Sequence, residues 1–327
     1  MNAVILAGGL GARLNPLTDL LPKPMLSVAN MPMIDYTISH LWDIGVKDFV
    51  FTLNYRPEHI IDWAIGYHGA VCRFSLEHIP LGTAGGVKAV EPLLNDVFFV
   101  LSGDIIQNIN LNAMLHKHLN SKAEITMAVV ESAHAQHFGV CQIDGWGSVT
   151  GFKEKPMGIS HGLVNTGVYI INKSVIASLP PNTKLDFAKD VLPALVQKQT
   201  LSAFIHEGYW RDVGTLQSYY HTNFELQGNG FFPPAPNRNR SRRLSHQTTQ
   251  PYNSLIASTA TVEGLAMHSI VGANARVHKG AEIENCIVLE GAHVLGRHTH
   301  SIIGANFVQK IEQPFIQHTH SYGQFMF

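Results

Sequence analysis

The chain has 327 residues, of which 45% are hydrophobic and 14% are charged, and its formal net charge is −1. This composition supports a sizeable hydrophobic core and excludes a largely disordered chain. A charge so close to zero gives no overall signal for binding to nucleic acid or to an anionic membrane surface, so neither is expected as a partner.

The sequence carries no sign of export or of membrane insertion. The opening MNAVILAGG lacks a charged segment before its short apolar run, so we interpret it as a β-strand that enters a glycine turn. No run approaches the roughly 20 apolar residues that a membrane span needs. The nineteen histidines are scattered, and Cys72, Cys141 and Cys286 lie far apart, which disfavours a zinc site or a disulfide framework. We expect a cytoplasmic protein with reduced thiols.

Short apolar strands alternate with amphipathic helices over roughly the first 225 residues. In chain order the predicted strands are Ala3–Leu6, Phe49–Leu53, Arg73–Leu76, Val97–Leu101, Ile125–Val130 and Val168–Ile171. The predicted helices are Met33–Ile44, Pro57–Tyr67, Gly86–Leu94, Leu111–Leu119, Ala188–Lys198 and Leu216–Leu226. This alternation predicts a Rossmann-like α/β domain over residues 1–228, with a mixed, mostly parallel sheet flanked by helices.

The composition changes after this domain. Residues 229–254 are predicted to form a linker or an exposed loop, because Phe231–Thr249 is rich in Pro, Asn, Arg and Ser and has no apolar period. A solvated basic loop is favoured over a phosphate contact for its four arginines, Arg238, Arg240, Arg242 and Arg243. The tail, residues 312–327, shows no usable period.

Residues 255–311 have a different texture, in which aliphatic residues recur every six positions with glycines between them. The recurring residues are Ile256 and Val262; Val271, Val277 and Ile283; and Val288 and Val294. This period is typical of a left-handed parallel β-helix, here of about three coils. So short a helix has open ends, and we therefore expect capping or a homo-oligomer.

The segment Leu6–Pro24 reads LAGGLGARLNPLTDLLPKP and carries the strongest chemical signal. Three glycines after the first strand let backbone N–H groups approach an anion, and Arg13 can neutralise phosphate oxygens. Lys23 lies between two prolines that restrict the backbone and so aim its side chain. The dinucleotide fingerprint is disfavoured because Leu14 replaces its third glycine, and no G-K-[ST] completes a P-loop.

The same segment resembles the signature G-G-x-G-x-R-L-x-P-L-T…P-K-P of the nucleoside-diphosphate-sugar pyrophosphorylases. The resemblance implies that the triphosphate is wrapped by Leu6, Ala7, Gly8, Gly9 and Gly11. It also implies that Arg13 and Lys23 are the catalytic cations, which stabilise charge on the α-phosphate and on the leaving pyrophosphate. Ala12 departs from the Thr or Ser of most members, so one hydroxyl contact to a phosphate is missing.

Two further segments match the family in order. Pro80–Gly86, PLGTAGG, resembles the segment that faces the nucleoside, which implies nucleotide contacts by Gly82, Thr83, Ala84 and Gly85 and base reading by Glu77. On its own this segment is equally well explained as a helix N-terminus capped by Thr83. Val97–Asp104 is a buried strand that delivers Asp104 at its carboxyl end, where open α/β sheets bind ligands. The resemblance makes Asp104 a ligand of Mg²⁺.

Three later segments resemble the family's sugar site. FGV implies a role for Gly139, FKEKP implies that Glu154 holds sugar hydroxyls and Lys155 the sugar phosphate, and NTG adds Asn165 and Thr166. In WRDVGT, Asp212 matches the second Mg²⁺ ligand and Gly214 is expected to pack under the sugar. Seven such segments in family order cover essentially all of residues 1–225.

The resemblance implies a nucleotidyltransferase that joins a nucleoside triphosphate to a sugar 1-phosphate and releases pyrophosphate. The appended β-helix favours the mannose-1-phosphate guanylyltransferase-like group, with GTP and mannose 1-phosphate or a related sugar such as a heptose phosphate. Uridylyl, thymidylyl and adenylyl transfer remain alternatives, as does an inactive regulatory subunit that binds a nucleotide sugar. Acyl transfer is disfavoured because the β-helix is short, although His278, His293 and His298 are available.

Overall fold

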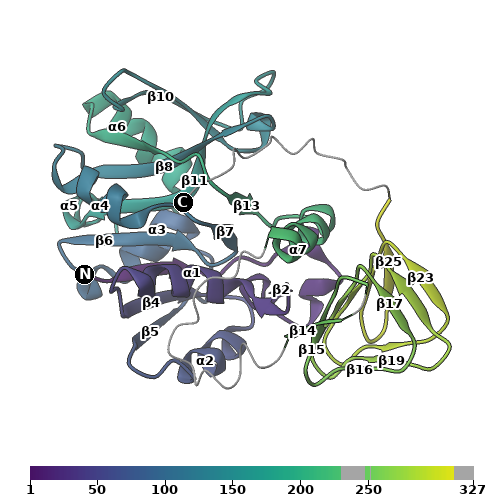
Figure 1. The fold of residues 1–327 in the computed structure, drawn as a ribbon. Coiled ribbons are helices and arrows are strands. Elements are labelled where there is room, and N and C mark those ends of the chain that lie inside the picture. Colours follow the sequence, from purple (N-terminus) through teal and green to yellow (C-terminus); the bar gives the residue numbers. More distant parts are fainter. Residues whose placement is uncertain (230–246, 251, 313–327) are drawn as a thin grey trace.

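The computed structural model describes residues 1–229, 247–250 and 252–312. An α/β domain is followed by a small β-helical domain, which packs at one side of it (Figure 1). The predicted basic linker falls largely outside the described residues, as do its four arginines and all of the tail after residue 312. In the part of the chain that is described, no helix combines the length and the apolar character that crossing a membrane requires.

A nine-stranded sheet forms the middle layer of the α/β domain. Its parallel core runs in the order β6, β1, β4, β5, and β11 joins the core antiparallel to β6. The antiparallel pairs β11–β9, β9–β10 and β11–β8 extend the sheet, and β12 adds parallel to β8. The bounds are β1 Ala3–Leu6, β4 Asp48–Leu53, β5 Val71–Leu76, β6 Val97–Ser102, β8 Ile125–Ser132, β9 Gly139–Ile143, β10 Val149–Glu154, β11 Gly162–Asn172 and β12 Leu201–Ile205.

Helices cover both faces of this sheet. On one face α1 (Met33–Asp43), α2 (Pro57–Ile65) and α4 (Leu111–Leu119) bury their apolar sides against the strands in a single cluster. The other face is covered by α3 (Gly82–Ala89), α5 (Lys173–Ala177) and α6 (Leu192–Lys198), which share a second cluster. The predicted Rossmann-like α/β fold, with a mixed, mostly parallel sheet flanked by helices, is confirmed.

Some predicted boundaries were wrong. The helix expected over Gly86–Leu94 runs from Gly82 to Ala89, and Glu91–Leu93 forms a separate 3-10 turn. Pro92 explains the break because it has no N–H to donate to the preceding turn. The helix expected over Ala188–Lys198 begins with a wide π-type turn at Phe187–Val191. Strands β9, β10 and β12 were not predicted.

The C-terminal domain is a parallel β-helix, as the six-residue period predicted. Its three sheets are β15-β18-β21-β24, β16-β19-β22 and β17-β20-β23, and all of these pairs are parallel. The predicted aliphatic residues line one interior cluster. The bounds are β15 Ser254–Ala257, β16 Thr261–Val262, β17 Leu265–Met267, β18 Ile270–Val271, β19 Arg276–Val277, β20 Glu282–Glu284, β21 Ile287–Val288, β22 His293–Val294, β23 Arg297–Thr299 and β24 Ser301–Ile303.

Antiparallel strands cover both edges of one of the three sheets. β14 (Gln247–Gln250) pairs with β15, and β25 (Val308–Lys310) pairs with β24. These two strands supply part of the capping that was predicted from the sequence. A sheet edge that is paired in this way no longer offers free N–H and C=O groups to another chain. The expected homo-oligomer stays a prediction.

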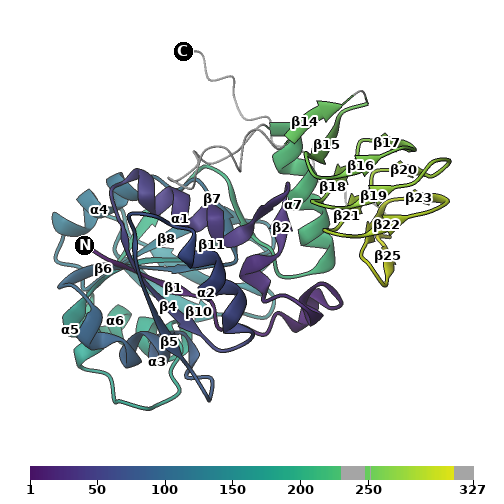
Figure 2. The same ribbon diagram turned by 90° about the horizontal axis from the view of Figure 1, so that it is seen from below.

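The β-helix docks on the α/β domain through the face that carries β15, β18, β21 and β24. Alternate residues of these strands face outward and are also aliphatic, and they join a cluster with α7 (Leu216–Asn229), β2 (Ser27–Val28) and β3 (Met31–Pro32). Figure 2 shows α7 and β2 beside the labelled strands β15, β18 and β21. The outward residues are Leu255, Ile270, Ile287 and Ile302. Asn30 Nδ2 donates to the carbonyl of Val271 at 3.1 Å.

Replacement of Ile287 by Ala is expected to lower the free energy of unfolding by about 2–5 kcal/mol, because the side chain is only 2% exposed and lies between the domains. A denaturant titration would measure this change. Leu295→Ala on the same β-helix is the control, since that side chain is 69% exposed and its loss should cost within about 0.5 kcal/mol. Equal effects of the two changes would show that the docked face contributes nothing to stability.

Candidate active site

The predicted catalytic segments meet at the carboxyl ends of two adjacent parallel strands. β1 pairs with β6, and the glycine loop follows β1 while Asp104 follows β6. The amide of Gly103 donates to the carbonyl of Leu6 at 2.9 Å, so the ends of the two strands are joined directly. This edge of an open α/β sheet is where ligands bind in such folds.

The glycine loop presents unused backbone donors. Among the described residues, the amides of Gly8, Gly9 and Gly11 have no hydrogen-bond acceptor, whereas the amide of Ala7 donates to the carbonyl of Thr52 at 3.0 Å. The predicted contact of Ala7 with a phosphate therefore cannot use its N–H group. The free N–H groups of the three glycines form a surface that suits an anion.

Gly11 is the position in this loop where only glycine fits. Its φ is +64°, and an added Cβ would lie 2.9 Å from Thr18 Cγ2 and 3.1 Å from Lys23 Cβ. Its carbonyl accepts from the amide of Leu14 at 2.8 Å and from the hydroxyl of Thr18 at 3.1 Å. The loop can therefore lie directly against the segment that carries Lys23.

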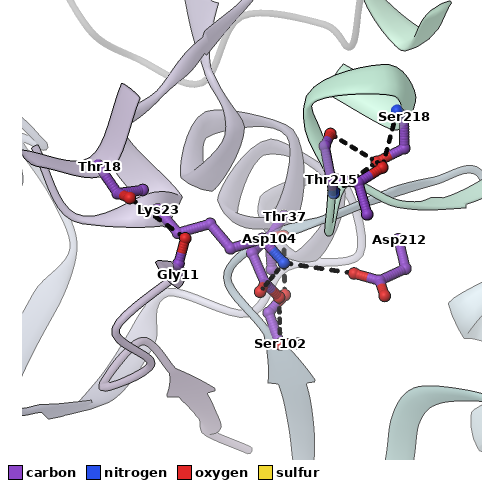
Figure 3. A network of polar contacts seen from close by, with 9 residues as sticks. All are labelled: Gly11, Thr18, Lys23, Thr37, Ser102, Asp104, Asp212, Thr215 and Ser218. Carbon is purple, nitrogen blue, oxygen red and sulfur yellow. Dashed lines mark hydrogen bonds and ion pairs between the residues drawn. The ribbon is translucent and has the colours of Figure 1, made fainter. Parts of the chain in front are cut away.

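Lys23, Asp104 and Asp212 form the centre of the site (Figure 3). The ammonium nitrogen of Lys23 is 2.5 Å from Asp104 Oδ2 and 3.3 Å from Asp212 Oδ1, and its side chain is only 10% exposed. Asp212 comes close through the short antiparallel pairing of β13 (Trp210–Asp212) with β7 (Ile105–Gln107), in which Asp212 lies opposite Ile105. Residues that are 189 positions apart are thus brought into contact.

The ion pairs control the charge of this cluster. Burial by itself lowers the pKa of Lys23, but the carboxylates of Asp104 and Asp212 outweigh burial and raise it above its usual value. Burial raises the pKa of Asp104, while the Lys23 ammonium and the Ser102 hydroxyl, which donates to Asp104 Oδ1, lower it overall. Lys23 and Asp104 are therefore ionised together at neutral pH, and the Lys23 ammonium also lies 3.3 Å from Asp212 Oδ1.

The same cluster has the chemistry of a divalent-cation site. Two carboxylates already enclose a cationic group, and hard cations such as Mg²⁺ prefer oxygen ligands. Within the described residues no group of three or more His, Cys, Asp or Glu side chains is placed to hold a metal. A cation at Asp104 and Asp212 would need further oxygens from a substrate phosphate or from water, which is common for Mg²⁺.

Arg13 extends the cationic surface beside Asp212. An added Cβ on Gly214 would lie 3.1 Å from Arg13 Nη2 and 3.2 Å from Asp212 Oδ2. Gly214 was expected to pack under the sugar, and in the structure it leaves room for the guanidinium next to the carboxylate. Arg13 itself is exposed at the end of the glycine loop. Arg13 Nη2 and Asp212 Oδ2 thus both lie near Gly214, while Lys23 contacts Asp212 Oδ1.

The predicted nucleoside segment packs mainly against its own chain. A Cβ added to Gly82 would lie 2.4 Å from the carbonyl oxygen of Leu185. A Cβ added to Gly85 would lie 2.4 Å from the carbonyl oxygen of Thr183. The amides of Ala84 and Gly85 donate to Leu185 O at 3.0 and 3.1 Å. The close approach that these glycines permit is thus made by residues 183–185, and the amides of Ala84 and Gly85 are not free for a nucleotide.

Thr83 is not the N-cap of α3, contrary to the simpler interpretation of this segment. Its hydroxyl donates to Asp186 Oδ2 at 3.0 Å and accepts from the amide of Phe187 at 2.9 Å. Thr83 therefore ties α3 to the turn before α6. The predicted contact of Thr83 with a nucleotide stays a prediction.

Glu77 is held in place just before this segment. Its Oε2 accepts from the amide of Leu81 at 2.9 Å, and its Oε1 lies 2.5 Å from the position of a Cβ on Gly86. Burial raises its pKa above the usual value for Glu. Asn54, which the sequence did not single out, donates from Nδ2 to the backbone carbonyl of Glu77 at 2.6 Å. Hydrogen bonds thus hold both the backbone of Glu77 and one oxygen of its half-buried carboxylate.

The predicted sugar residues lie on β11, on β9 and at the end of β10. Gly139 on β9 lies opposite Glu154 on β10, and an added Cβ would come within 2.8 Å of Glu154 Oε2. Lys155 adopts a left-handed φ of 44°, and its Nζ lies 3.7 Å from Glu154 Oε1. Asn165 donates to Tyr169 OH at 2.5 Å. In the part of the chain described, no hydrogen bond or ion pair links this group to Lys23.

Thr166 serves the scaffold through its side chain, and its contact with the sugar stays a prediction. Its side chain is buried and donates to the carbonyl of Ala128 at 2.9 Å. Its own carbonyl accepts from Trp210 Nε1 at 3.1 Å. Thr166 therefore positions the strand that carries Asp212. Sequence reasoning missed this role of Trp210, although Trp210 opens the segment WRDVGT.

Three comparisons show which known proteins this chain is similar to. The profile of the family described as Nucleotidyl transferase matches residues 2–228. A mannose-1-phosphate guanyltransferase from Yarrowia lipolytica is 34% identical over 275 residues, which are 80% of this chain and 73% of that relative. A mannose-1-phosphate guanylyltransferase from Mycobacterium tuberculosis is 28% identical over 298 residues, 88% of this chain and 79% of that protein.

A solved structure is also similar. HddC from Yersinia pseudotuberculosis, complexed with GMP-PN, superimposes with a TM-score of 0.59 at 29% identity. The match covers 69% of this chain and 99% of that one. Over the α/β domain with its loop of free amides and its Lys23–Asp104–Asp212 cluster, the chain belongs to the nucleotidyl transferase family and is a nucleotidyltransferase.

Proposed function

We propose that this nucleotidyltransferase joins GTP to mannose 1-phosphate, forming GDP-mannose and pyrophosphate. The observation that carries the reaction is the contact of Lys23 with Asp104 and Asp212 beside a loop of free amide donors. The choice of GTP and mannose 1-phosphate is supported by the names of the relatives from Yarrowia lipolytica and Mycobacterium tuberculosis. A related sugar 1-phosphate, or a uridylyl, thymidylyl or adenylyl donor, is the alternative that an assay must exclude.

In this reaction an oxygen of the sugar phosphate attacks the α-phosphorus in line, and the bond to the leaving pyrophosphate breaks. The attacking phosphate is already ionised at neutral pH, so the site needs no general base. It must hold two anions together and neutralise charge as it moves. We assign that work to the amides of Gly8, Gly9 and Gly11 and to the cations of Arg13 and Lys23.

We propose that Asp104 and Asp212 hold Mg²⁺. Bound there, the ion would neutralise phosphate oxygens and favour their alignment. The carboxylates supply two of its oxygen ligands, and the ammonium of Lys23 already shows that a cation is accepted between them. Lys23 therefore has two functions in the proposal, since it keeps the carboxylates together and can also turn to a phosphate.

The sugar end of the site is proposed to lie at Gly139, Glu154, Lys155 and Asn165. Glu154 is half-buried and can accept from sugar hydroxyls, while 65% of the Lys155 side chain is exposed and free to meet a phosphate. Gly139 has no side chain, which lets Phe152 and Glu154 Oε2 pack closely against it. We also propose domain limits of 1–228 and 255–311, a cytoplasmic location and a homo-oligomer.

The first experiment is pyrophosphate release from the full chain with Mg²⁺, each nucleoside triphosphate and a panel of sugar 1-phosphates. Release that requires both GTP and mannose 1-phosphate is the expected result. Release with UTP, dTTP or ATP would keep the reaction and overturn the proposed base. Absence of release with every pair would favour a regulatory subunit that only binds nucleotide sugar.

Glu77→Gln is expected to raise KM for GTP by about 10- to 100-fold, which corresponds to about 1–3 kcal/mol. Guanine presents N1–H and N2–H₂ as neighbouring donors, and a carboxylate accepts both, whereas an amide offers one oxygen. KM for mannose 1-phosphate should change much less. Glu58→Gln on α2 is the control, because Glu58 is exposed. An unchanged KM for GTP would remove Glu77 from the base site.

A further inference from the structure

A cleft of about 310 Å³ lies between α7 and one corner of the β-helix, apart from the catalytic cluster. α7 contributes the aromatic rings of Tyr220 and Phe224 and the imidazole of His221. The volume falls at the lower end of the usual range for small-molecule sites. No residue predicted from the sequence to bind substrate lines this cleft.

The opposite wall is a ladder of alternating amides and imidazoles, one from each coil of the β-helix. Asn253, His268, Asn285 and His300 have left-handed φ values of 54°, 43°, 51° and 48°. The backbone shows that these four positions are equivalent in successive coils. Each of the last three donates its amide to the carbonyl of the residue just before the preceding rung: His268 to Tyr252, Asn285 to Met267 and His300 to Glu284. Successive rungs are therefore one strand spacing apart, about 4.8 Å.

α7 is fastened to this ladder through backbone carbonyls and not through the side chains of the ladder. Tyr220 OH donates to the carbonyl of Asn285 at 2.7 Å, and Gln227 Nε2 donates to that of Asn253 at 2.6 Å. Within the ladder, Asn285 Nδ2 and His300 Nε2 are 3.4 Å apart. The width of the cleft is thus fixed by two hydrogen bonds that do not use the side chains of the rungs.

One polar atom of the cleft residues is left unsatisfied. His221 Nε2 is shielded from water and has no hydrogen-bond partner among the described residues. Burial lowers the pKa of His221, which favours the neutral ring. A shielded nitrogen without a partner costs free energy that a hydrogen-bonding ligand could recover.

The lining selects a flat, uncharged and hydrogen-bonding ligand. In the described chain no Lys, Arg, Asp or Glu lines the cleft, so it offers neither a cation for a polyanion nor a carboxylate for an amine. Aromatic faces favour stacking with a planar ring, and Asn and His side chains both donate and accept. Nucleobases combine these properties.

We propose that the cleft between α7 and the Asn253–His268–Asn285–His300 ladder binds the base of a nucleoside. The base stacks on Phe224 and makes hydrogen bonds to the ladder, while the ribose faces the open side of the cleft. This second site is separate from the nucleotide site at Lys23. It does not depend on the proposed substrates of the reaction.

The experiment is calorimetric titration of the full chain with guanosine and with adenosine, which lack the phosphates that the catalytic loop holds. We expect saturable binding of at least one of them. The double variant His268→Gly/His300→Gly should weaken it about 10- to 100-fold, because two hydrogen-bonding rings are lost. Glycine tolerates the left-handed φ at both positions, so these changes introduce no backbone strain.

Asn274→Gly is the matched control, since Asn274 also has a left-handed φ, 57°, in a β-helix turn outside the cleft. Phe224→Leu keeps an apolar side chain but removes the stacking ring, and should also weaken binding. Absence of saturable binding of both nucleosides to the wild-type chain would overturn the proposal. So would binding that survives the double variant but is lost in Glu77→Gln, because the nucleoside would then occupy the catalytic site.

Discussion

Lys23→Met is expected to reduce the turnover number by about 10²–10³, the usual effect of losing one preorganised charge donor in an active site. The lysine is buried between two carboxylates, and the left-handed turn at Gly11 lies close to its Cβ. Methionine keeps an aliphatic side chain of similar length in that space and removes the charge. The change should therefore act on the reaction, and steady-state pyrophosphate release under saturating substrates measures it.

Lys153→Met is the control for this prediction. Lys153 is exposed on β10, next to Glu154 in the sequence, and its side chain makes no ion pair among the described residues. Its loss should leave turnover close to that of the wild type. Near-normal turnover in Lys23→Met, with a circular dichroism spectrum unchanged in both variants, would remove Lys23 from the catalytic machinery.

The buried parallel strands could be predicted from sequence because they are continuous apolar runs. Val97–Leu101 is such a run, and it forms β6 with one more residue at its end. Strand β10 was missed because Val149–Glu154 includes glycine, lysine and glutamate and lies at the edge of the sheet, where few side chains are buried. Apolar periodicity detects burial, so it does not detect an edge strand that carries polar residues.

The glycines show a different limit. Gly82 and Gly85 were interpreted as places where a base approaches the backbone, and the structure places the chain's own residues 183–185 there. A glycine indicates that something comes close, but sequence spacing does not identify what comes close. Thr166 shows the same limit, since a hydroxyl suits both a sugar and a backbone carbonyl, and in the structure it donates to the carbonyl of Ala128.

The sequence of the β-helix contains a second pattern that the six-residue period did not include. The six-residue period identified the inward residues, such as Val271 and Val288, which lie in the interior cluster. Each of these follows an isoleucine, Ile270 or Ile287, that packs on the α/β domain. An aliphatic pair on a two-residue strand means that both faces are buried, so the docking face could have been predicted from these doublets.

The sequence identified Lys23 and the two distant aspartates through motifs in family order, but it did not predict that the three side chains are in contact. What brings Asp212 to Asp104 is the pairing of β13 with β7, and neither short strand has a clear sequence signal. The hydrogen bond from Trp210 Nε1 to the carbonyl of Thr166 then fixes β13 against the main sheet. Long-range pairing of this kind depends on the three-dimensional fold, so the geometry of the site could be seen only in the structure.

Asp104→Asn is expected to reduce turnover and to raise the Mg²⁺ concentration that gives half-maximal activity. Loss of a residue that only supports a metal ligand lowers metal affinity by about 10- to 100-fold, and loss of the ligand itself should have a larger effect. The amide keeps the shape and the hydrogen bond from Ser102 but loses the negative charge that a hard cation needs. Asp212→Asn should act in the same direction with a smaller effect. Its carboxylate lies farther from the Lys23 ammonium, at 3.3 Å against 2.5 Å, and is more exposed, at 31% against 24%.

A titration of activity with Mg²⁺ at saturating substrates measures both changes. Asp48→Asn is the control, because Asp48 begins β4 at the opposite end of the parallel strands and pairs there with Arg73. Its Mg²⁺ dependence should match that of the wild type. If the Asp104 and Asp212 variants needed no more Mg²⁺ than this control, the carboxylates would serve only to hold Lys23, and the cation would have to be bound elsewhere. The proposed site requires both aspartates to share one cation, so their double variant should need little more Mg²⁺ than Asp104→Asn alone.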